Sequence, residues 1–459
     1  MRTGLRNSID QVHSTESNLF PAIFYLVYFY KILIFITSII SKILIILRFL
    51  LSIIKTNQVI TSMGKKILII NSKAPYPLHT GGEMRSYQMI KSLSQLYAYD
   101  DIDLLYLTDK ENPETDNGLR PYCKNIYSFT SSKYESIRNT LLGLVFGNLP
   151  LQVYYFYSSE IRQWIDNNLH RYDTVFCNNI RTAEYVRKKE NVIKIIDYVD
   201  AISMNYERAK QKSSGIWKIL YSIDHKRCLN YETDILERFD KTMIISAIDG
   251  KYISSNSTHP KREIAVISNI TDIPPYIKTN YHETAKSLVF VGSMYYESNI
   301  TAVCYFVNEV FDKIKKEFPG LIFYIVGNRP DPKVVKLGEK EGIVVTGFVD
   351  DVSEYFTGPS IFVAPMLSGA GVQNKILQAM AAGCPVVTTT IGAEGIEGIT
   401  EKEIVICDDA RSMADNIIRM LNHDEERKTR AENARKYVLD NLSEDIILEK
   451  FKQIIQSSS

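Results

Sequence analysis

Short runs rich in β-branched residues alternate with longer amphipathic stretches from Lys66 onward. This alternation is typical of βαβ units, in which helices connect parallel strands and cover both faces of the sheet. The sequence therefore predicts an α/β fold with doubly wound parallel sheets. The expected strands are residues 67–71, 102–107, 174–177, 192–196, 242–245, 288–291, 321–326, 343–345, 361–364, 386–388 and 404–407.

The alternation is interrupted by a polar, proline-containing stretch at residues 269–285 and then starts again. Two such runs joined by a linker predict two Rossmann-like domains that face a cleft, with ligands at the carboxyl ends of the strands. We expect the first domain over residues 63–275, the second over 276–440 and a C-terminal helix over 441–459. The expected helices of the second run are residues 302–318, 375–382, 412–421 and 424–455.

The segment before the first strand is strongly apolar. Only three charged residues, Lys31, Lys42 and Arg48, interrupt residues 20–54. A continuous helix of this length would reach about 52 Å, which exceeds the ~30 Å hydrocarbon core of a bilayer. We therefore expect a hydrophobic, helical, membrane-associated segment over residues 1–62, either one spanning helix with an interfacial extension or two shorter segments.

Positive residues crowd the carboxyl-terminal flank of this segment more than its amino-terminal flank. By the positive-inside rule, the main body is expected at the cytoplasmic face of the membrane, with an N-terminal transmembrane anchor. A start at Met63 is an open alternative, because Met63 directly precedes the first expected strand. Residues 1–62 would then lie upstream of the native start. A buried core helix of this length is the less favoured interpretation.

Composition excludes several classes of protein. Lys and Arg number 54 against 53 acidic residues, which gives a net charge of +1, so no basic excess indicates a nucleic-acid partner. The six cysteines are scattered along the chain, and none is close enough to another to predict a zinc or redox pair. They are expected to be reduced thiols in the cytosol.

Two glycine-containing loops are candidate binding sites. Gly81 and Gly82 follow the first expected strand and open a helix that carries Arg85. Paired glycines let backbone N–H groups approach a phosphate or a sugar, and a helix N-terminus favours anions. The pattern is not G-x-G-x-x-G, so a dinucleotide site is not indicated, and a plain tight turn with Arg85 in solvent is the alternative.

The second loop contains Gly369 and Gly371 and opens a helix with Asn374 and Lys375 in its first turn. A cation beside free helical N–H groups suits a diphosphate. Gln378 lies one turn later, where its amide can hydrogen-bond ribose hydroxyls. A βα turn with Lys375 in solvent is the alternative, although the helix dipole disfavours a lysine in a first turn.

Three further residues follow expected strands of the first domain. Arg181 is a candidate contact for an acceptor phosphate, with a surface arginine as the alternative. Asp197 and Asp200 lie at a strand end, where a general base is plausible and helix capping by Asp200 is equally plausible.

The run from Gly371 to Val387 resembles the donor-site signature of family 4 glycosyltransferases, which adopt the GT-B fold, and particularly the branch associated with exopolysaccharide. Residues 290–299, 325–328 and 345–352 resemble the other loops of the donor domain. The Gly81–Gly82 loop and residues 197–203 resemble the acceptor domain. The resemblance covers about residues 64–455 in the expected order.

The resemblance implies a nucleotide-sugar donor, UDP- or GDP-linked, and a glycan or lipid-linked acceptor. It also implies retention of anomeric configuration without a metal or other cofactor, and a last helix that crosses back to the first domain. The expected donor-binding residues are Gly292, Ser293, Gly327, Gly347, Phe348, Val349, Gly369, Gly371, Val372, Gln373, Asn374, Lys375 and Gln378. The expected acceptor-binding residues are Gly81, Gly82, Arg85, Arg181 and Asp197. The expected catalytic residues are Lys375, Asp200 and Gly82.

The sequence departs from the family pattern at three places. Ala370 and Gln378 stand where the wider family carries two glutamates, and Ser293 and Met294 stand where Arg and Lys are usual. Lys375 is therefore the expected main cation on the diphosphate. A non-catalytic nucleotide-sugar-binding partner in glycan assembly and a GT-B sugar-nucleotide epimerase are the alternative functions.

Overall fold

The computed structural model describes residues 66–457, except for 79, 111, 259–262, 275–285, 357–359 and 370. The chain separates into two units, Met1–Gly64 and Lys65–Ser459. The expected apolar segment over residues 1–62 lies outside the described residues. Within residues 66–457, those gaps aside, we find no helix that combines the length and the hydropathy needed to cross a membrane.

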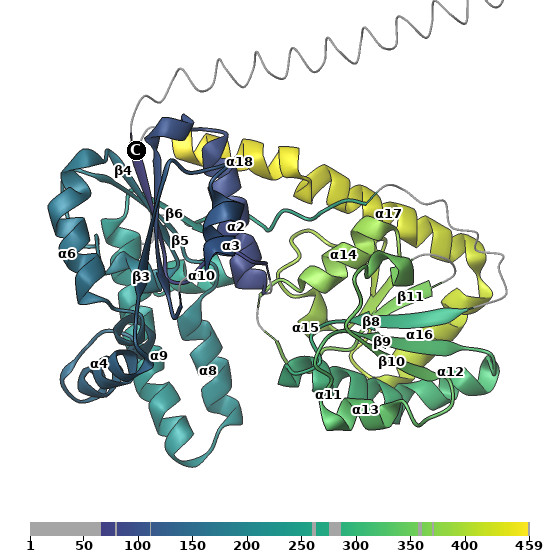
Figure 1. Ribbon diagram of the computed structural model, residues 1–459. Helices are drawn as coiled ribbons and strands as arrows, with labels where there is room; N and C mark the ends of the chain where they lie inside the picture. The colour runs from purple at the N-terminus through teal and green to yellow at the C-terminus, as the bar shows by residue number, and fades with distance from the viewer. Residues whose placement is uncertain are drawn as a thin grey trace, which may run out of the picture. The chain divides into compact units, whose positions relative to one another are not determined.

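The N-terminal half of the larger unit contains a parallel sheet of seven strands in the order β3-β2-β1-β4-β5-β6-β7 (Figure 1). Every residue of the middle strand, β4, is buried, as expected for a strand covered on both faces by helices. The strands are β1 (Ile67–Asn71), β2 (Ile102–Thr108), β3 (Asn125–Thr130), β4 (Thr174–Asn178), β5 (Ile193–Asp197), β6 (Lys241–Ile244) and β7 (Ala265–Val266).

Helices surround this sheet, and the first of them begins at a capping box. The Thr80 hydroxyl accepts a hydrogen bond from the Glu83 amide, while the Glu83 carboxylate accepts one from the Thr80 amide. The α-helices are α2 (Gly81–Ser94), α3 (Pro113–Leu119), α4 (Lys133–Phe146), α5 (Leu151–Tyr155), α6 (Ser159–Asn168), α7 (Ile180–Ala183), α8 (Ile202–Lys212), α9 (Gly215–Arg238) and α10 (Ala247–Ser255).

The C-terminal half contains a parallel sheet of six strands in the order β10-β9-β8-β11-β12-β13. Its strands are β8 (Ser287–Val291), β9 (Ile322–Val326), β10 (Ile343–Gly347), β11 (Ser360–Ala364), β12 (Val386–Thr388) and β13 (Ile404–Ile406). Its α-helices are α11 (Glu297–Tyr305), α12 (Phe311–Glu317), α13 (Pro332–Leu337), α14 (Asn374–Ala382), α15 (Thr390–Ala393) and α16 (Ala410–Asn422). A π-helical segment, Phe306–Val310, joins α11 to α12.

The last expected helix, residues 424–455, is in fact two helices, α17 (Asp424–Leu442) and α18 (Glu444–Gln456). The break falls at Ser443, whose backbone is extended. α17 packs against α14, whereas Phe451 of α18 lies edge-on to Phe176 of β4, with 6.3 Å between the ring centroids. The two helices thus lie one on each sheet-containing half (Figure 1).

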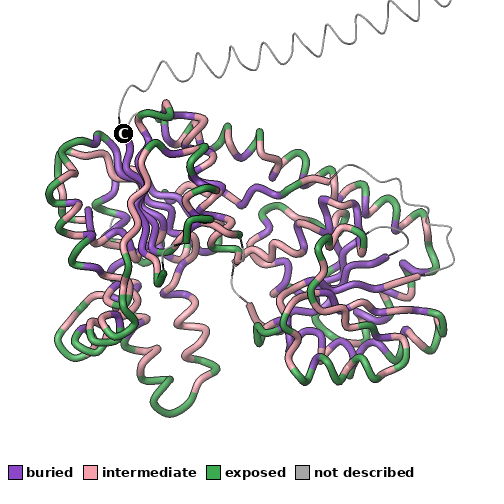
Figure 2. Tube along the Cα trace, viewed as in Figure 1, coloured by how far each residue is buried: buried purple, intermediate pink, exposed green. Residues whose placement is uncertain are grey.

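All the strands predicted from the sequence are present, with ends that differ by one or two residues. Two strands were not predicted, β3 and β7. β3 is an edge strand that is only half-buried along most of its length, so its sequence lacks the strongly apolar run of a central strand. β7 has two residues, too few for any periodicity. The predicted α/β fold with two doubly wound parallel sheets is confirmed, and the sheets form the buried core (Figure 2).

Candidate functional site

The predicted donor-binding glycines lie at the carboxyl ends of neighbouring strands. Gly292 follows β8, Gly327 follows β9 and Gly347 ends β10, and these strands are adjacent in the sheet. A Cβ added at Gly327 would lie 1.8 Å from the Gly292 carbonyl oxygen. Two loops therefore meet through bare backbone, which only glycine permits at this distance.

The loop after β11 leads into a helix whose N-terminus has no side-chain cap. Gly371 adopts a φ of 68°, in the left-handed region that favours glycine. Gln373 occupies the N-cap position of α14, but its side chain accepts no hydrogen bond from the first turn. The Ile376 amide donates to the Gln373 carbonyl at 2.9 Å. The amides of Asn374 and Lys375 have no partner among the described residues, so they are available to water or to an anion. Gly369 and Val372 lie in the same loop, and Ala370 lies outside the described residues.

Lys375 is a half-buried, largely desolvated cation in the first turn of α14. Its ammonium donates a hydrogen bond to the Asn299 amide oxygen and lies 4.9 Å from the centroid of the Phe290 ring. Among the described residues, no carboxylate lies within ion-pair distance of it. Burial lowers the pKa of Lys375 to about 8. An ammonium that is desolvated and has no counter-ion gains most from a bound anion.

Asn299 was not predicted as a site residue, although it ends the segment 290–299 that resembles the first donor loop. It lies on α11 and is 6 % exposed. Its amide nitrogen donates to the Ser293 carbonyl at 3.0 Å, while its amide oxygen accepts from Lys375. Asn299 therefore ties the loop after β8 to the first turn of α14, and its place at the end of that segment was the only signal available in the sequence.

Two more predicted donor residues lie beside these loops. Gln378 is half-buried on α14, one turn after Lys375. Phe348 follows β10 and is 73 % exposed, whereas Val349 beside it is half-buried. An exposed aromatic ring at a strand's carboxyl end is available to stack on a planar ligand.

On the N-terminal side, a cavity of about 180 Å³ lies at the carboxyl ends of β1, β4 and β5. It brings together three predicted residues, Gly82, Arg181 and Asp200, which come from different parts of the chain. The other residues that line it are Ser72, Lys73, Ala74, Thr80, Glu83, Ser86, Asn178, Asn179, Val199 and Ile202.

Arg181 presents a largely desolvated guanidinium to this cavity. Its Nε donates to the Gln152 side-chain oxygen at 2.8 Å, and its guanidinium lies 4.6 Å from the Phe156 ring centroid. Burial lowers the pKa of Arg181. The Lys73 ammonium lies 5.7 Å from the centroid of the same ring, so two cations flank Phe156.

Asp200 is one of two carboxyl groups among the residues that line the cavity, the other being Glu83. Burial, together with the charge of Asp249, raises the pKa of Asp200 to about 6, although Arg181 and the Asn205 amide oppose the shift. The Asn205 side chain donates to it at 2.8 Å. Asp200 does not cap α8, because Ala201 occupies the N-cap position. A carboxylate with a raised pKa is suited to accept a proton near neutral pH.

Arg85 and Asp197 are placed differently from the other predicted acceptor residues. They form an ion pair at 2.8 Å, with both side chains completely buried, and neither lines the cavity. Arg85 also donates to the carbonyl of Ser268 at 3.0 Å, and the neighbouring Asn269 donates to the Asn374 side chain at 3.0 Å. The pair therefore holds the segment after β7 against the first residue of α14.

Gly81 lies at this same junction. A Cβ added to it would be 3.6 Å from the Asn374 side-chain nitrogen. The glycine loop of the N-terminal half thus approaches the N-terminus of α14, where the uncapped amides and Lys375 lie. In the part of the chain that the structure describes, no three His, Cys, Asp or Glu side chains gather as a metal site requires.

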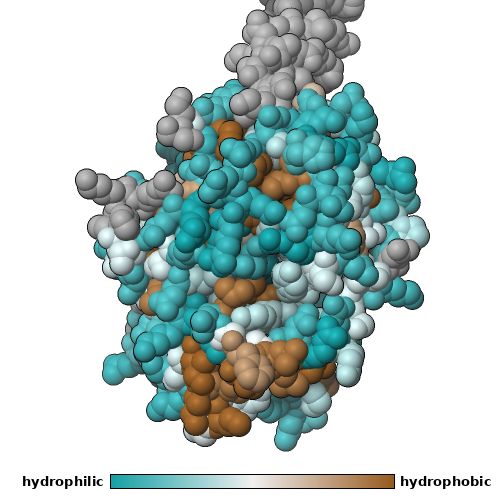
Figure 3. Space-filling model, turned by 90° about the vertical axis from the view of Figure 1, so that its left-hand side faces the viewer, coloured by the Kyte–Doolittle hydropathy of each residue, from teal (hydrophilic) through white to brown (hydrophobic). Residues whose placement is uncertain are grey.

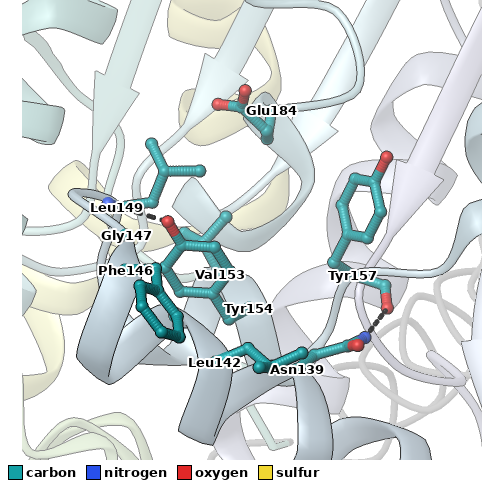
Figure 4. A pocket seen from close by; sticks show the side chains of 10 residues that line it. Asn139, Leu142, Phe146, Gly147, Leu149, Val153, Tyr154, Tyr157 and Glu184 are labelled. Atoms are coloured by element: carbon teal, nitrogen blue, oxygen red, sulfur yellow. Dashed lines mark hydrogen bonds between the residues drawn. The ribbon is translucent and has the colours of Figure 1, made fainter.

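A second cavity, of about 440 Å³, lies between α4 and α5 (Figure 4). Its lining is mainly apolar and includes Leu142, Phe146, Leu149, Val153 and Tyr154. The figure shows the Tyr154 ring lying between Leu149 and the α4 side chains, with its hydroxyl accepting a hydrogen bond from the Leu149 amide at 3.3 Å. None of the predicted site residues lines this cavity.

Residues 285–423 match the family described as "Glycosyl transferases group 1". A Klebsiella pneumoniae protein described as "Uncharacterized 44.6 kDa protein in cps region" is 26 % identical over 395 residues, which cover 82 % of this chain and 96 % of that protein.

Solved structures share the fold. A sucrose-phosphate synthase from Thermosynechococcus elongatus superposes with a TM-score of 0.59 at 15 % identity, over 85 % of this chain and 98 % of its own. Anabaena HepE in complex with UDP and glucose superposes with a TM-score of 0.59 at 14 % identity, over 86 % of this chain and 100 % of HepE. WaaG, a glycosyltransferase involved in lipopolysaccharide biosynthesis, superposes with a TM-score of 0.57 at 17 % identity, over 85 % of this chain and 100 % of WaaG. The family match and the shared fold support a glycosyltransferase of the GT-B type.

Proposed function

We propose that this protein is a retaining, metal-independent glycosyltransferase of family 4. It would transfer a sugar from a nucleotide sugar to a glycan or lipid-linked acceptor in surface polysaccharide synthesis. One observation carries the proposal: the Lys375 ammonium is largely desolvated and has no counter-ion among the described residues, and it lies in the first turn of α14, whose N-terminus has no side-chain cap. That arrangement fits a diphosphate.

The donor is proposed to lie along the carboxyl ends of β8, β9, β10 and β11. The backbone of residues 347–349 would contact the base, Gln378 the ribose, and the Gly292 and Gly371 loops with Lys375 the diphosphate. A UDP-linked donor is favoured over a GDP-linked one, because structures of HepE, which has the same fold, hold UDP and UDP-glucose.

The chemistry assigned to this site is stabilisation of the leaving nucleoside diphosphate. Negative charge grows on the β-phosphate as the bond to the sugar breaks. The Lys375 ammonium and the free amides of α14 would face that charge in a site with little water, where they stabilise it strongly. Asn299 would act as a positioning residue, since it holds the ammonium and the Ser293 loop together.

The acceptor is proposed to enter the cavity lined by Gly82, Arg181 and Asp200. The buried Asn178 amide nitrogen lines this cavity without a hydrogen-bond partner among the described residues. With Lys73 and Arg181 it provides donors for an anionic acceptor such as a lipid-linked phosphate. The relative encoded in a cps region supports a polysaccharide product. Asp200 would receive the acceptor's proton.

The donor site is tested by calorimetric titration of the full chain with UDP, GDP, UDP-glucose and GDP-mannose. We expect selective binding of UDP compounds, with about 100-fold weaker binding in Lys375→Met, because a charged hydrogen-bonded contact contributes about 1.5–3 kcal/mol. Lys336→Met, an exposed lysine of α13, is the matched control and should bind as the wild type does. No nucleotide binding at all would overturn the proposal.

Transfer is tested separately, with membranes as the source of acceptor and radiolabelled UDP-sugars as donors. Tight UDP binding without any transfer would favour a non-catalytic partner in glycan assembly, the alternative that the substitution of Gln378 for the usual glutamate suggests. Location at the cytoplasmic face of a membrane, through residues 1–62, is part of the proposal. Protease access to the C-terminus in sealed membranes tests it.

A further inference from the structure

Helix α4 is turned with its large apolar side chains toward solvent. Its buried positions are the small residues Ser136 and Gly143. Spacings of three and four residues place the large apolar residues along the outer side of the helix. These residues and their exposed fractions are Tyr134 (78 %), Ile137 (54 %), Leu141 (59 %), Leu142 (53 %), Val145 (70 %) and Phe146 (83 %).

The first turns of α9 continue this exposure. Ile216, Trp217 and Ile219 are each 60 % exposed or more. Further along α9, Arg227 donates hydrogen bonds to the carbonyls of Gly143 and Leu144, so the two helices are in contact. Figure 3 shows apolar side chains gathered at the lower end of the face that carries α4. We call the six α4 residues and these three α9 residues the apolar face.

The apolar face has a basic border. From Ala209 to Ile223, across the turn between α8 and α9, the chain carries three lysines and no carboxylate. These are Lys210, Lys212 and Lys218, of which the last two are exposed. Contiguous exposed apolar side chains of this extent mark a binding surface. Apolar side chains, a tryptophan and lysines together are the chemistry of an anionic lipid surface.

We propose that the apolar face docks on the anionic surface of a lipid bilayer. The charges at the border of the face favour this partner over two others, a second copy of the chain and the chain's own apolar segment. A second copy is disfavoured, because its matching surface carries the same lysines and, from Ala209 to Ile223, no carboxylate to pair with them. The apolar segment over residues 20–54 carries three cations and no carboxylate, so it is also of the wrong sign.

The cavity between α4 and α5 adjoins this face, because Leu142 and Phe146 belong to both. Its volume is about 440 Å³ and its lining is mainly apolar. A lipid chain would find an apolar space there next to the bilayer surface. The docking proposal does not rest on the nucleotide site, and it gives the described body a membrane contact separate from residues 1–62.

The two tryptophans of the chain allow a direct test. Trp217 belongs to the apolar face, whereas Trp164 on α6 is half-buried against Tyr127, with 4.6 Å between the rings. The full chain carrying Trp164→Phe reports on Trp217 alone, and the full chain carrying Trp217→Phe is the matched control. Both are reconstituted in vesicles of equal parts phosphatidylcholine and phosphatidylglycerol, with brominated acyl chains as the fluorescence quencher.

We expect an about two-fold or greater loss of Trp217 emission in brominated vesicles and little loss of Trp164 emission, because an interfacial tryptophan reaches the upper acyl chains. Replacing Lys210, Lys212 and Lys218 by Gln, or raising the salt, should reduce the quenching. Cooperative thermal unfolding of each variant, measured by circular dichroism in detergent, confirms that it is folded and is independent of docking.

Unquenched Trp217 in a folded chain would overturn the proposal. If Trp217 emission is instead blue-shifted without lipid and changes with protein concentration, a second copy covers the face. If the shift is independent of concentration and is lost when residues 1–62 are removed, that segment covers it. Either result contradicts docking on lipid.

Discussion

The two halves of the candidate site hold charge in different ways. On the proposed donor side, the candidate anion site consists mostly of backbone: loops that meet at Gly292 and Gly327, the uncapped N-terminus of α14 and one cation, Lys375. On the proposed acceptor side, the cavity is lined by individual side chains, among them Arg181 and Asp200. A backbone site requires glycine at fixed positions, whereas a side-chain site can be built from many residue types.

This difference explains why the sequence indicates a donor site more clearly than an acceptor site. The diphosphate of a nucleotide sugar is common to many donors, and a backbone site for it leaves glycines at strand ends that a sequence pattern detects. The family match accordingly covers residues 285–423, in the donor half. Acceptors differ in chemistry, so the residues that would select them carry no fixed spacing. The predictions below test this contrast at the junction, on the donor side and then on the acceptor side.

The largest effect is expected where the halves meet. Arg85→Met leaves the Asp197 carboxylate buried without its counter-ion, and removing one member of a buried ion pair costs about 3–5 kcal/mol of unfolding free energy. Chemical denaturation of the full chain measures this loss. The double variant Arg85→Met/Asp197→Leu is the control and should recover most of the stability. Equal losses in both would mean that packing, and not the charge, matters at this position.

Gly327→Ala is expected to damage the donor side alone. The added Cβ would meet the Gly292 carbonyl at 1.8 Å, so the loops after β8 and β9 must separate. We expect UDP affinity to fall about 10-fold or more, with about 1–3 kcal/mol lost from stability as in other overpacked sites. Gly320→Ala is the matched control, because nothing lies within 4 Å of its added Cβ. Unchanged UDP binding in Gly327→Ala would contradict a backbone-built donor site.

The secondary structure could be predicted from the sequence more fully than the tertiary contacts between side chains. Buried parallel strands are continuous apolar runs, so β1 and β8 were evident, whereas the half-buried edge strand β3 was not. The break of the last helix at Ser443 was also missed, since polar charged residues continue on both sides of it. Arg85 and Asp197 were predicted as acceptor-binding residues, but the structure pairs them with each other away from the cavity, and no sequence pattern indicated this pairing. Pairing depends on the packing of β5 against α2, which is a tertiary property.

The pH dependence of UDP binding sharpens the assignment of Lys375. The pKa of Lys375 in the free protein is about 8, and a bound diphosphate would raise it. Above pH 8, binding must therefore take up a proton, so UDP affinity is expected to fall about 10-fold per pH unit. Between pH 8 and the ordinary lysine value near 10.5, the unfolded chain holds a proton that the folded chain has lost, so stability of the free protein should rise with pH in this window.

Calorimetry between pH 7 and 10 measures the fall in UDP affinity. Lys375→Arg is the control, because its guanidinium remains charged over this range and its affinity should change little with pH. An identical pH profile in both proteins would show that another group titrates.

The smallest effect is expected from Arg181→Gln, and it should be confined to the acceptor side. Gln152 and Phe156, the two neighbours of the guanidinium, both lie in the N-terminal half, so UDP affinity should stay within about two-fold of the wild type. Transfer to an anionic acceptor should fall about 10-fold, because a hydrogen bond to a charged group contributes about 1.5–3 kcal/mol. Arg171→Gln, at an exposed arginine that follows α6, is the control. Equal loss of UDP binding and transfer in Arg181→Gln would mean that the two halves are not separable, since a side chain of the acceptor cavity would then also shape the donor site.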